Sequence, residues 1–431
     1  MAPSLPLAGR GHVLCLRGSR WTTPYDCLSG NSVLGGTIEA TVFERPAMHR
    51  TAIVAASLLA LAAPLSHAQN QGKTLQVKIG TASPLSGTGA HQGKDIENGA
   101  RMAIDELNAK GIVLGGRKVQ WVLQPEDDGA DPKTGAAVAQ KLVDAKVAAV
   151  VGHLNSGTTV PASKIYSNAG IPQISPAATT PLYTNQGFKT AFRVVANDNL
   201  VGRTLATYAI GTLKAKKIAV IDDRTAFGQG LADEFVKGVK KAGPAATVVS
   251  RQFTNDKATD FNAILTQIRA RDPDVIFYGG MDAVAGPMLK QMKALGLRAK
   301  LVSGDGVCSE KMPLLAGDAL VDDKVYCVVA GGVGAAQEAG LNTFTQRYRQ
   351  RYKLPIQSYA PYAYDAVMVF AKAMQTANSS EPAKFLPALA AVRHEGVTGN
   401  IAFDQKGDLR DAAMTIYTFR KGKKVRLAVL H

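Results

Sequence analysis

From Leu75 onward, short apolar runs alternate with segments of helical periodicity, and this alternation limits the chain to few folds. Val147–Val151 and Ile218–Ile221 are typical of strands covered on both faces, because each run is almost uninterrupted by polar residues. Between such runs, apolar residues recur at helical spacing, as in Gly93–Lys110. Alternating strands and helices predict parallel sheets with helices on both faces.

The alternation occurs in two consecutive series of similar length, and the second series begins near Asp198. At 431 residues, the chain is long enough to form two substantial cores. We therefore predict an α/β fold with two lobes, each built on a doubly wound parallel sheet. Ligands in such folds lie beyond the carboxyl ends of strands and between lobes, and a cleft that opens and closes is typical of a solute-binding protein.

Two loops that follow predicted strands have the composition of a ligand site. Gly152–Thr159 and Ile174–Thr180 each bring hydroxyl residues, glycine or alanine to a strand end, and the first loop leads into a predicted helix. Backbone N–H groups and hydroxyls at a helix N-terminus suit a small anion such as a carboxylate. Neither loop contains a strong nucleophile with a base beside it, so the pattern indicates binding and not catalysis.

The region before the alternating pattern resembles a targeting segment. Residues 48–68 have a short basic start, an apolar centre and small residues before Gln69, which is the layout of a secretory signal peptide. We expect cleavage near Ala68 and export to the periplasm, and we interpret residues 1–47 as an upstream translation artefact without a folded structure. A membrane anchor or a buried helix is the alternative, although Ala52–Leu65 is shorter than the ~20 residues that span a bilayer.

The chain carries a formal net charge of +16, but its basic residues are scattered. The densest basic run, Arg420–Arg426, is typical of an exposed strand and turn, and a nucleic-acid surface is the alternative. The charge can also assist approach to an acidic membrane surface or partner. Cys308 and Cys327 predict one disulfide in an oxidising compartment, worth about 3 kcal/mol; two separate buried thiols remain the alternative.

The sequence contains no complete motif for catalysis, nucleotide binding or metal binding. Gly87–Gly93 approaches a dinucleotide-binding pattern, but its third glycine falls one place late. Lys133 lacks the Ser-x-x-Lys partner of penicillin-recognising enzymes. The histidines after residue 68 lack metal-ligand spacing, and His153 is interpreted as a structural histidine. We therefore expect no enzyme activity, no cofactor and no metal.

Several segments in order resemble the leucine/isoleucine/valine-binding protein family, the periplasmic receptors of branched-chain amino acid ABC transporters. The resemblance covers Val77 to about Thr418. It rests on Pro84–Gly87, Asp131–Lys133, Gly152–Leu154 with Ser156, Pro161–Ser163, Ser175–Thr179, Phe227–Gly230, Tyr278–Gly280, Gly304–Gly306 and Gly407–Asp408. It implies a type I periplasmic binding fold that binds a free amino acid, acts as a monomer and delivers its ligand to an inner-membrane permease.

The resemblance also implies roles for individual residues. Ser156 and Thr179 would bind the α-carboxylate, while the Ala177 carbonyl, the Thr179 hydroxyl and Asp305 would accept from the α-ammonium. A buried zwitterion needs both charges matched, because leaving a charge unpaired after desolvation is costly. Ordinary strand-end caps at Ser156 and Thr179, and a turn-forming role for Asp305, are the alternatives. Leu154 belongs to the same first-lobe loop.

Four positions depart from the family's usual pattern. Asp305 stands where a Glu is common, Gln92 where an aromatic is frequent, Phe227 where a Tyr is common, and Met281 in place of another aromatic. The last three belong to the end of the pocket that receives the ligand's side chain or to the contact between the lobes. The sequence therefore leaves the ligand's side chain open, and a same-fold receptor for an amide, an aromatic or another carboxylic acid is the alternative function.

By the same resemblance, the chain crosses between lobes three times, and the lobes close on a hinge. Lobe 1 is expected to contain residues 72–197 and 330–397, and lobe 2 residues 198–329 and 398–431. The disulfide found in the first lobe of some family members would fall at Ala130 and Asn155 and is absent here.

Overall fold

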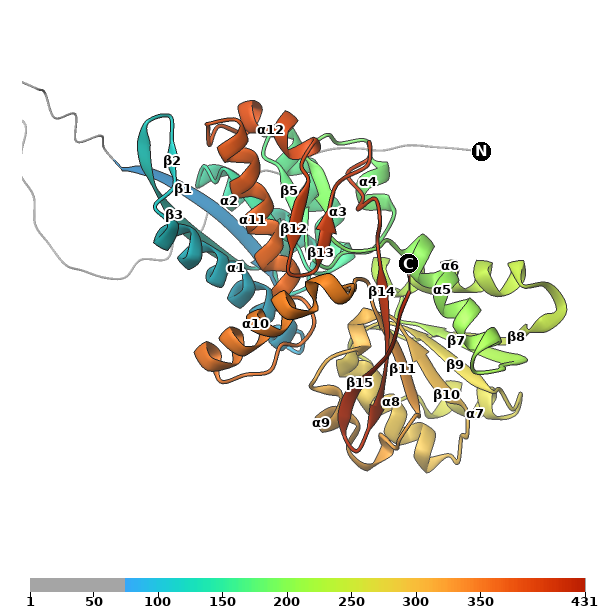
Figure 1. The fold of residues 1–431 in the computed structure, drawn as a ribbon. Helices are drawn as coiled ribbons and strands as arrows, with labels where there is room; N and C mark the ends of the chain where they lie inside the picture. Colours follow the sequence, from blue (N-terminus) through green and yellow to red (C-terminus); the bar gives the residue numbers. More distant parts are fainter. Residues whose placement is uncertain (1–73, 431) are drawn as a thin grey trace, which may run out of the picture. The chain divides into compact units, whose positions relative to one another are not determined.

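The computed structural model describes residues 74–430, which form two large sheets, each flanked by helices (Figure 1). The predictions for residues 1–47 and for the signal peptide at 48–68 lie outside the described residues. Within 74–430, no helix combines the length and the apolar character that a membrane span requires.

The first sheet has the strand order β2-β3-β1-β4-β5-β6. Its strands are β1 (Leu75–Ser83), β2 (Val113–Leu114), β3 (Arg117–Asp127), β4 (Ala149–Gly152), β5 (Gln173–Ser175) and β6 (Ala191–Arg193). Only the β2-β3 pair of this sheet is antiparallel. The connections reverse direction between β1 and β4, so a crevice opens beyond the carboxyl ends of these strands.

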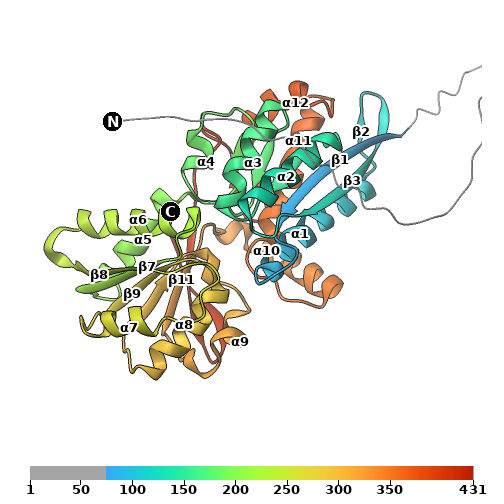
Figure 2. The ribbon, with the colours of Figure 1, turned by 180° about the vertical axis from the view of Figure 1, so that it is seen from behind.

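Helices cover both faces of this sheet. The long α1 (Ala90–Lys110) packs against α11 (Ala360–Thr376) on one face, and α2 (Pro132–Asp144) packs against α3 (Ser156–Asn168) on the other. Figure 2, which views the molecule from behind, shows α2 and α3. The Asp131 side chain accepts from the Thr134 N–H at 2.8 Å and caps α2, and Pro132 occupies the first helical position. The remaining helices beside this sheet are α4 (Leu182–Asn185), α10 (Ala335–Tyr352) and α12 (Pro382–Ala390).

The second sheet repeats the same strand pattern and adds a hairpin at one edge. Its order is β15-β14-β11-β10-β9-β7-β8. Its strands are β7 (Lys217–Asp222), β8 (Thr247–Phe253), β9 (Val275–Gly279), β10 (Lys300–Ser303), β11 (Val325–Val329), β14 (Met414–Arg420) and β15 (Lys423–Leu430). The strands from β8 to β11 are parallel, and β14 and β15 are added antiparallel. The basic run at 420–426 thus forms the turn and the first half of β15, in line with the strand and turn predicted for it.

Helices again cover both faces. One face carries α5 (Asp198–Gly211) and α6 (Ala226–Lys241), which pack against each other. The other face carries α7 (Asn262–Arg269), α8 (Asp282–Ala294) and α9 (Met312–Ala316). The stacked rings of Phe235 and Phe277, with centroids 4.0 Å apart, fix α6 on β9. The parallel sheets with helices on both faces agree with the predicted architecture.

Three connections join the two sheets within the described residues: β6 to α5, β11 to α10, and β13 (Gly399–Ile401) to β14. β13 pairs with β12 (His394–Gly396). The turn after β13 still contacts the first sheet, because the Arg193 N–H donates to the Gly407 carbonyl at 3.0 Å and its guanidinium pairs with Asp408 at 2.6 Å. This places residues 399–408 beside the first sheet, whereas the sequence analysis assigned them to the second lobe. The last crossing therefore falls between 408 and 414.

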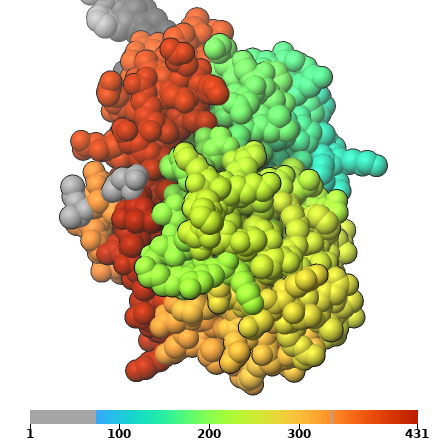
Figure 3. Space-filling model, turned by 90° about the vertical axis from the view of Figure 1, so that its right-hand side faces the viewer, coloured from blue at the N-terminus to red at the C-terminus, as the bar shows by residue number. Residues whose placement is uncertain are grey.

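In Figure 3 the red C-terminal residues form a surface strip along one side of the view, with orange residues of the second sheet beside its lower part. Near the same edge, Cys308 and Cys327 form the predicted disulfide, with Cα atoms 5.5 Å apart. The disulfide joins the segment that follows β10 to β11. Consequently, the loop that carries Asp305 is covalently tied to the strand that leads to a connection between the sheets.

Candidate functional site

The two hydroxyl-rich loops of the first sheet lie side by side because β4 and β5 are neighbouring parallel strands. The Ser175 hydroxyl links them: it donates to the His153 carbonyl at 2.9 Å and accepts from the Ala178 N–H at 2.8 Å. The Ser156 hydroxyl accepts from the Thr180 N–H at 3.3 Å. The structure therefore brings together Ser156 and Thr179, which are 1% and 0% exposed.

Other residues of these loops serve the scaffold. His153 contacts Asp128 through Nδ1 at 2.7 Å and the Tyr166 hydroxyl through Nε2 at 3.1 Å. Both ring nitrogens are thus satisfied, which agrees with its interpretation as a structural histidine. Leu154 and Ala177 are buried among apolar side chains, and their own side chains make no polar contact.

Asp305 reaches the site from the second sheet, where it begins a short 3₁₀ helix just after β10. Its Oδ2 accepts from the Tyr359 hydroxyl at 2.9 Å, and Tyr359 precedes α11 of the first sheet. Its Oδ1 is buried and has no hydrogen-bond partner among the described residues. Burial raises the pKa of Asp305 to about 6, and the bond from Tyr359 opposes this rise.

A second buried carboxylate, at Asp198, belongs to the same site and was not predicted. Asp198 begins α5, and its N–H donates to the Thr179 carbonyl at 2.8 Å. Neither of its carboxylate oxygens has a partner of good geometry within residues 74–430. Burial raises the pKa of Asp198 to about 7; the nearby Thr179 hydroxyl lowers this pKa, and the charge of Asp305 raises it further.

The sequence held a signal for Asp198 that pattern analysis did not use. The residue was recognised as the start of the second β/α series and as a crossing between lobes, yet it received no role in binding. A residue where the chain crosses from one lobe to the other lies near the cleft between them, so an acidic residue there can reach a bound ligand. Its position alone could have marked it as a candidate.

The unpartnered atoms define what the site can hold. Asp198 and Asp305 offer three unpartnered carboxylate oxygens, and the Thr179 hydroxyl is unpartnered as well within the described structure. A buried carboxylate without a partner is costly, so this arrangement suits a cationic group such as an ammonium. Ser156 and the N-terminus of α3 lie on the other side of Thr179, where an anionic group is favoured. The geometry therefore suits a zwitterion.

Three of the four residues that depart from the family pattern converge on Gly306, which follows the fourth, Asp305. The Gln92 Nε2 donates to the Gly306 carbonyl at 3.1 Å. A Cβ atom added at Gly306 would lie 2.7 Å from the Met281 sulfur and 3.1 Å from the Phe227 ring. The structure thus brings Gln92, Phe227 and Met281 together around Gly306, beside the second-sheet carboxylate.

A cavity of about 540 Å³ adjoins this end of the site. Its walls include Thr88 and Asn155 from the first sheet and Arg224, Phe227 and Met281 from the second. Beside it, the His91 Nε2 lies 2.7 Å from the Asp282 carboxylate, which also accepts from the Ser309 hydroxyl. The edges of both sheets therefore meet around the site through direct contacts.

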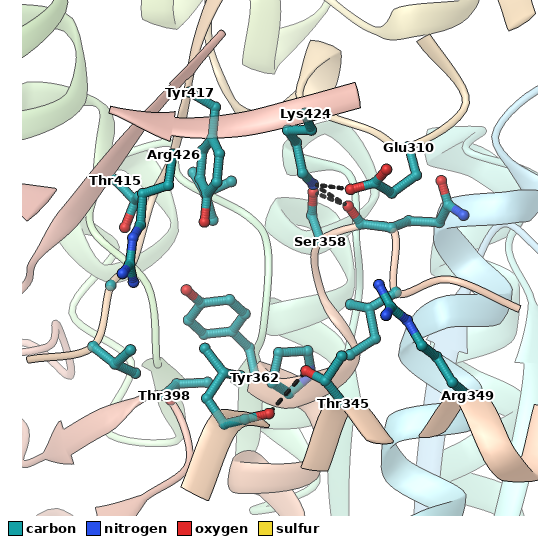
Figure 4. Close-up of a pocket in the computed structure, with 17 residues that line it drawn as sticks. Glu310, Thr345, Arg349, Ser358, Tyr362, Thr398, Thr415, Tyr417, Lys424 and Arg426 are labelled. Atoms are coloured by element: carbon teal, nitrogen blue, oxygen red, sulfur yellow. Dashed lines mark hydrogen bonds and ion pairs between the residues drawn. The ribbon is translucent and has the colours of Figure 1, made fainter. Parts of the chain in front are cut away.

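A second cavity, of about 190 Å³, lies away from these residues and contains none of the predicted site residues (Figure 4). Its most buried cation, Lys424, donates to the carbonyls of Cys308 and Gln357 at 3.0 Å and lies 3.4 Å from Glu310. Burial lowers the pKa of Lys424. Because its partners come from the disulfide loop and from the segment before α11, Lys424 acts as a structural tie between them.

Two parallel-rich α/β sheets, joined by three connections and with polar residues converging at their carboxyl ends, have the architecture of a two-lobed solute-binding protein. Residues 76–424 match the family model described as periplasmic binding protein, and the chain belongs to this family. Its fold is the type I periplasmic binding protein fold, as predicted. The family comprises substrate-binding proteins of ABC transporters, so the protein is a binding protein and not an enzyme.

Individual relatives agree with this assignment. The chain is 34% identical over 350 residues to the Leu/Ile/Val-binding protein homolog 1 of Brucella abortus, covering 80% of this chain and 91% of the relative. It is 34% identical over 345 residues to the leucine-, isoleucine-, valine-, threonine- and alanine-binding protein of Pseudomonas aeruginosa, covering 80% and 90%. The branched-chain amino acid transporter substrate-binding protein of Streptococcus pneumoniae, solved with isoleucine, superposes with a TM-score of 0.73 at 28% identity, covering 82% and 99%. The predicted resemblance is confirmed.

Proposed function

We propose that this protein captures a free amino acid between its two lobes and delivers it to an inner-membrane ABC permease. The branched-chain amino acids are the first candidates, because the relatives above carry them in their names. One observation carries the proposal: the same site contains two buried carboxylates with unpartnered oxygens, Asp198 and Asp305, and the buried hydroxyls of Ser156 and Thr179. One side matches an ammonium and the other a carboxylate.

In this proposal each residue has a defined role. Ser156 and Thr179 bind the carboxylate, and the Ala177 carbonyl, the Thr179 hydroxyl, Asp198 and Asp305 accept from the ammonium. The ligand's side chain lies toward the residues around Gly306, with Leu154 on the first-lobe side. Contacts to both lobes favour the closed state, so ligand binding shifts the protein toward closure. We propose that the protein acts as a monomer.

Calorimetric titration of ligand-stripped protein tests the proposal with a panel of amino acids, amides and short carboxylates. We expect at least one free amino acid to bind, whereas its amide and its N-acetyl derivative, which lack one charge, bind far more weakly. A panel in which no amino acid binds, or in which these singly charged derivatives bind as tightly, contradicts the proposal. An aromatic or aliphatic acid without an ammonium as the only ligand would favour the alternative receptor function.

A matched pair of variants tests the site directly. Ser156→Ala should weaken binding, because it removes a hydroxyl from the carboxylate side. Ser163→Ala is the control: Ser163 is equally buried on α3, but its hydroxyl contacts only the Val160 carbonyl and Gln186. Equal effects of the two variants would point to helix packing and not to ligand contact.

The proposed location of the protein is the periplasm, after cleavage of the signal peptide at 48–68. N-terminal sequencing of the exported protein should start at Gln69 or a neighbouring residue. A mature N-terminus before residue 48 would contradict the expectation for both N-terminal segments.

A further inference from the structure

Gln92 occupies a buried position with one half of its amide unsatisfied. It lies in the first turn of α1 and is fully buried. Its Nε2 donates to the Gly306 carbonyl, which can only accept, so the orientation of the amide is fixed by this bond. The opposite atom, Oε1, is therefore an acceptor, and it has no partner in the part of the chain that the structure describes.

The two side chains that lie against Gly306 from the second sheet offer no donor for this oxygen. Phe227 and Met281, which lie on the other sides of Gly306, present a ring and a thioether. The neighbouring Asp305 carries a further unpartnered acceptor, Oδ1. Asn155, in the wall of the 540 Å³ cavity, has an unpartnered buried Oδ1 as well. The unpartnered oxygens of Gln92, Asp305 and Asn155 are thus all acceptors.

An amino acid's ammonium cannot satisfy all of these acceptors. It has three N–H donors, and the carboxylates of Asp198 and Asp305 already present three unpartnered oxygens, beside the Thr179 hydroxyl. The oxygen of Gln92 is additional to this set. A buried acceptor that stays unpaired in the complex weakens binding, so a ligand that brings a further donor is favoured.

We infer that Gln92 selects amino acids whose side chain donates a hydrogen bond, namely those with a neutral hydroxyl or amide group. This inference rests on the proposed function and specifies the ligand class of the same site. Gln92, Phe227 and Met281 carry no charge, so none of these three side chains would pair with a second cation. A purely aliphatic side chain of the same size leaves the Gln92 oxygen unpaired.

Two isosteric pairs of ligands test the inference in the unmodified protein. Threonine and valine differ by a hydroxyl in place of a methyl group, and asparagine and leucine differ by a carboxamide in place of an isopropyl group. Calorimetric titration of each ligand should show threonine binding more tightly than valine, or asparagine more tightly than leucine, by about 10-fold or more. The pair that responds reports how far from the α-carbon Gln92 reaches.

A variant pair connects the preference to this residue. Gln92→Leu removes the acceptor with little change in volume and should abolish the preference or reverse it toward the aliphatic member of the pair. Gln173→Leu is the control: Gln173 is equally buried on β5, donates its Nε2 to the Gly152 carbonyl at 2.9 Å and has an unpartnered Oε1 within the described residues, so this change should leave the order of the ligands unchanged. Circular dichroism melts of both variants establish that they are folded.

The outcomes separate this inference from the proposed function. If valine and leucine bind the unmodified protein as tightly as threonine and asparagine, the inference is wrong and the proposed function stands. If the polar ligands bind more tightly but Gln92→Leu keeps the same order, the acceptor is another residue and the inference about Gln92 is wrong. If no amino acid in the full panel binds, the proposed function fails, and the inference fails with it.

Discussion

Replacing Asp198 by Asn should stabilise the ligand-free protein while weakening its binding of an amino acid. The wild-type carboxylate is buried, neither of its oxygens has a hydrogen-bond partner of good geometry within the described structure, and burial raises its pKa from 3.8 to about 7. The protonated form therefore favours the folded state; this contribution is fully present below pH 3.8 and is lost as the pH rises through 7. Above pH 7 the ionised carboxylate costs the folded state at most about 4 kcal/mol.

Asp198→Asn removes this cost, because an amide of the same shape does not ionise. We expect its free energy of unfolding in urea to exceed that of the wild type by about 2–4 kcal/mol at pH 8. At pH 5 the gain should fall to about half, because wild-type Asp198 is then protonated when folded. Binding should respond in the opposite sense. An ammonium favours the ionised carboxylate, so wild-type affinity should fall about 100-fold from pH 8 to pH 5 through Asp198 alone.

Asp365 provides a control with the same burial and the opposite expectation. Its pKa is also raised by burial, to about 6, but its carboxylate accepts from the N–H groups of Val397 and Thr398 at 3.0 and 2.8 Å. Asp365→Asn turns an NH₂ group toward these donors and should lower the free energy of unfolding. If Asp198→Asn lowers it as much at pH 8, Asp198 has a protein partner, and the assignment of its carboxylate to the ligand is refuted.

Three further predictions address the site and its frame. Asp305→Ala should weaken amino acid binding by more than about 1 kcal/mol, because it leaves the ligand's ammonium with one carboxylate fewer; titration showing unchanged affinity would contradict its role. Replacing Cys308 and Cys327 together by serine should lower the free energy of unfolding by about 3 kcal/mol, given their separation of 19 residues, and urea melts that match the wild type would contradict this. His91→Ala removes the 2.7 Å contact with Asp282 and should speed ligand dissociation several-fold, as stopped-flow fluorescence can measure.

Much of the fold was predictable because parallel α/β lobes leave strong local signals. The strand β4 and the centre of β7, Ile218–Ile221, are uninterrupted apolar runs, and the Asp131-Pro132 start of α2 is visible in the sequence. The last crossing was misplaced because it depends on long-range contacts. Nothing near residue 407 indicates that its carbonyl accepts from Arg193, more than two hundred positions earlier.

In the candidate site, too, the residues with local sequence signals were predictable and those placed by long-range contacts were not. Ser156 and Thr179 follow apolar strands, so their place at the sheet edge could be predicted. Asp198 could not be assigned to the site by strand patterns, because it begins a helix and its environment is formed by both sheets. The role of Gln92 was also hidden, since the direction of its amide is decided by a carbonyl that lies 214 positions away in the chain.

The bond from the Tyr359 hydroxyl to Asp305 has a consequence for the rate of ligand delivery. Tyr359 belongs to the first-sheet side and Asp305 to the second, so opening of the cleft breaks this bond whether or not a ligand is present. Part of the barrier to release is thus independent of the ligand and set by the protein itself. Because the bond stabilises the closed state for every ligand alike, we expect Tyr359 to raise residence time and affinity for all ligands together, while the ligand-binding residues decide which molecule is preferred.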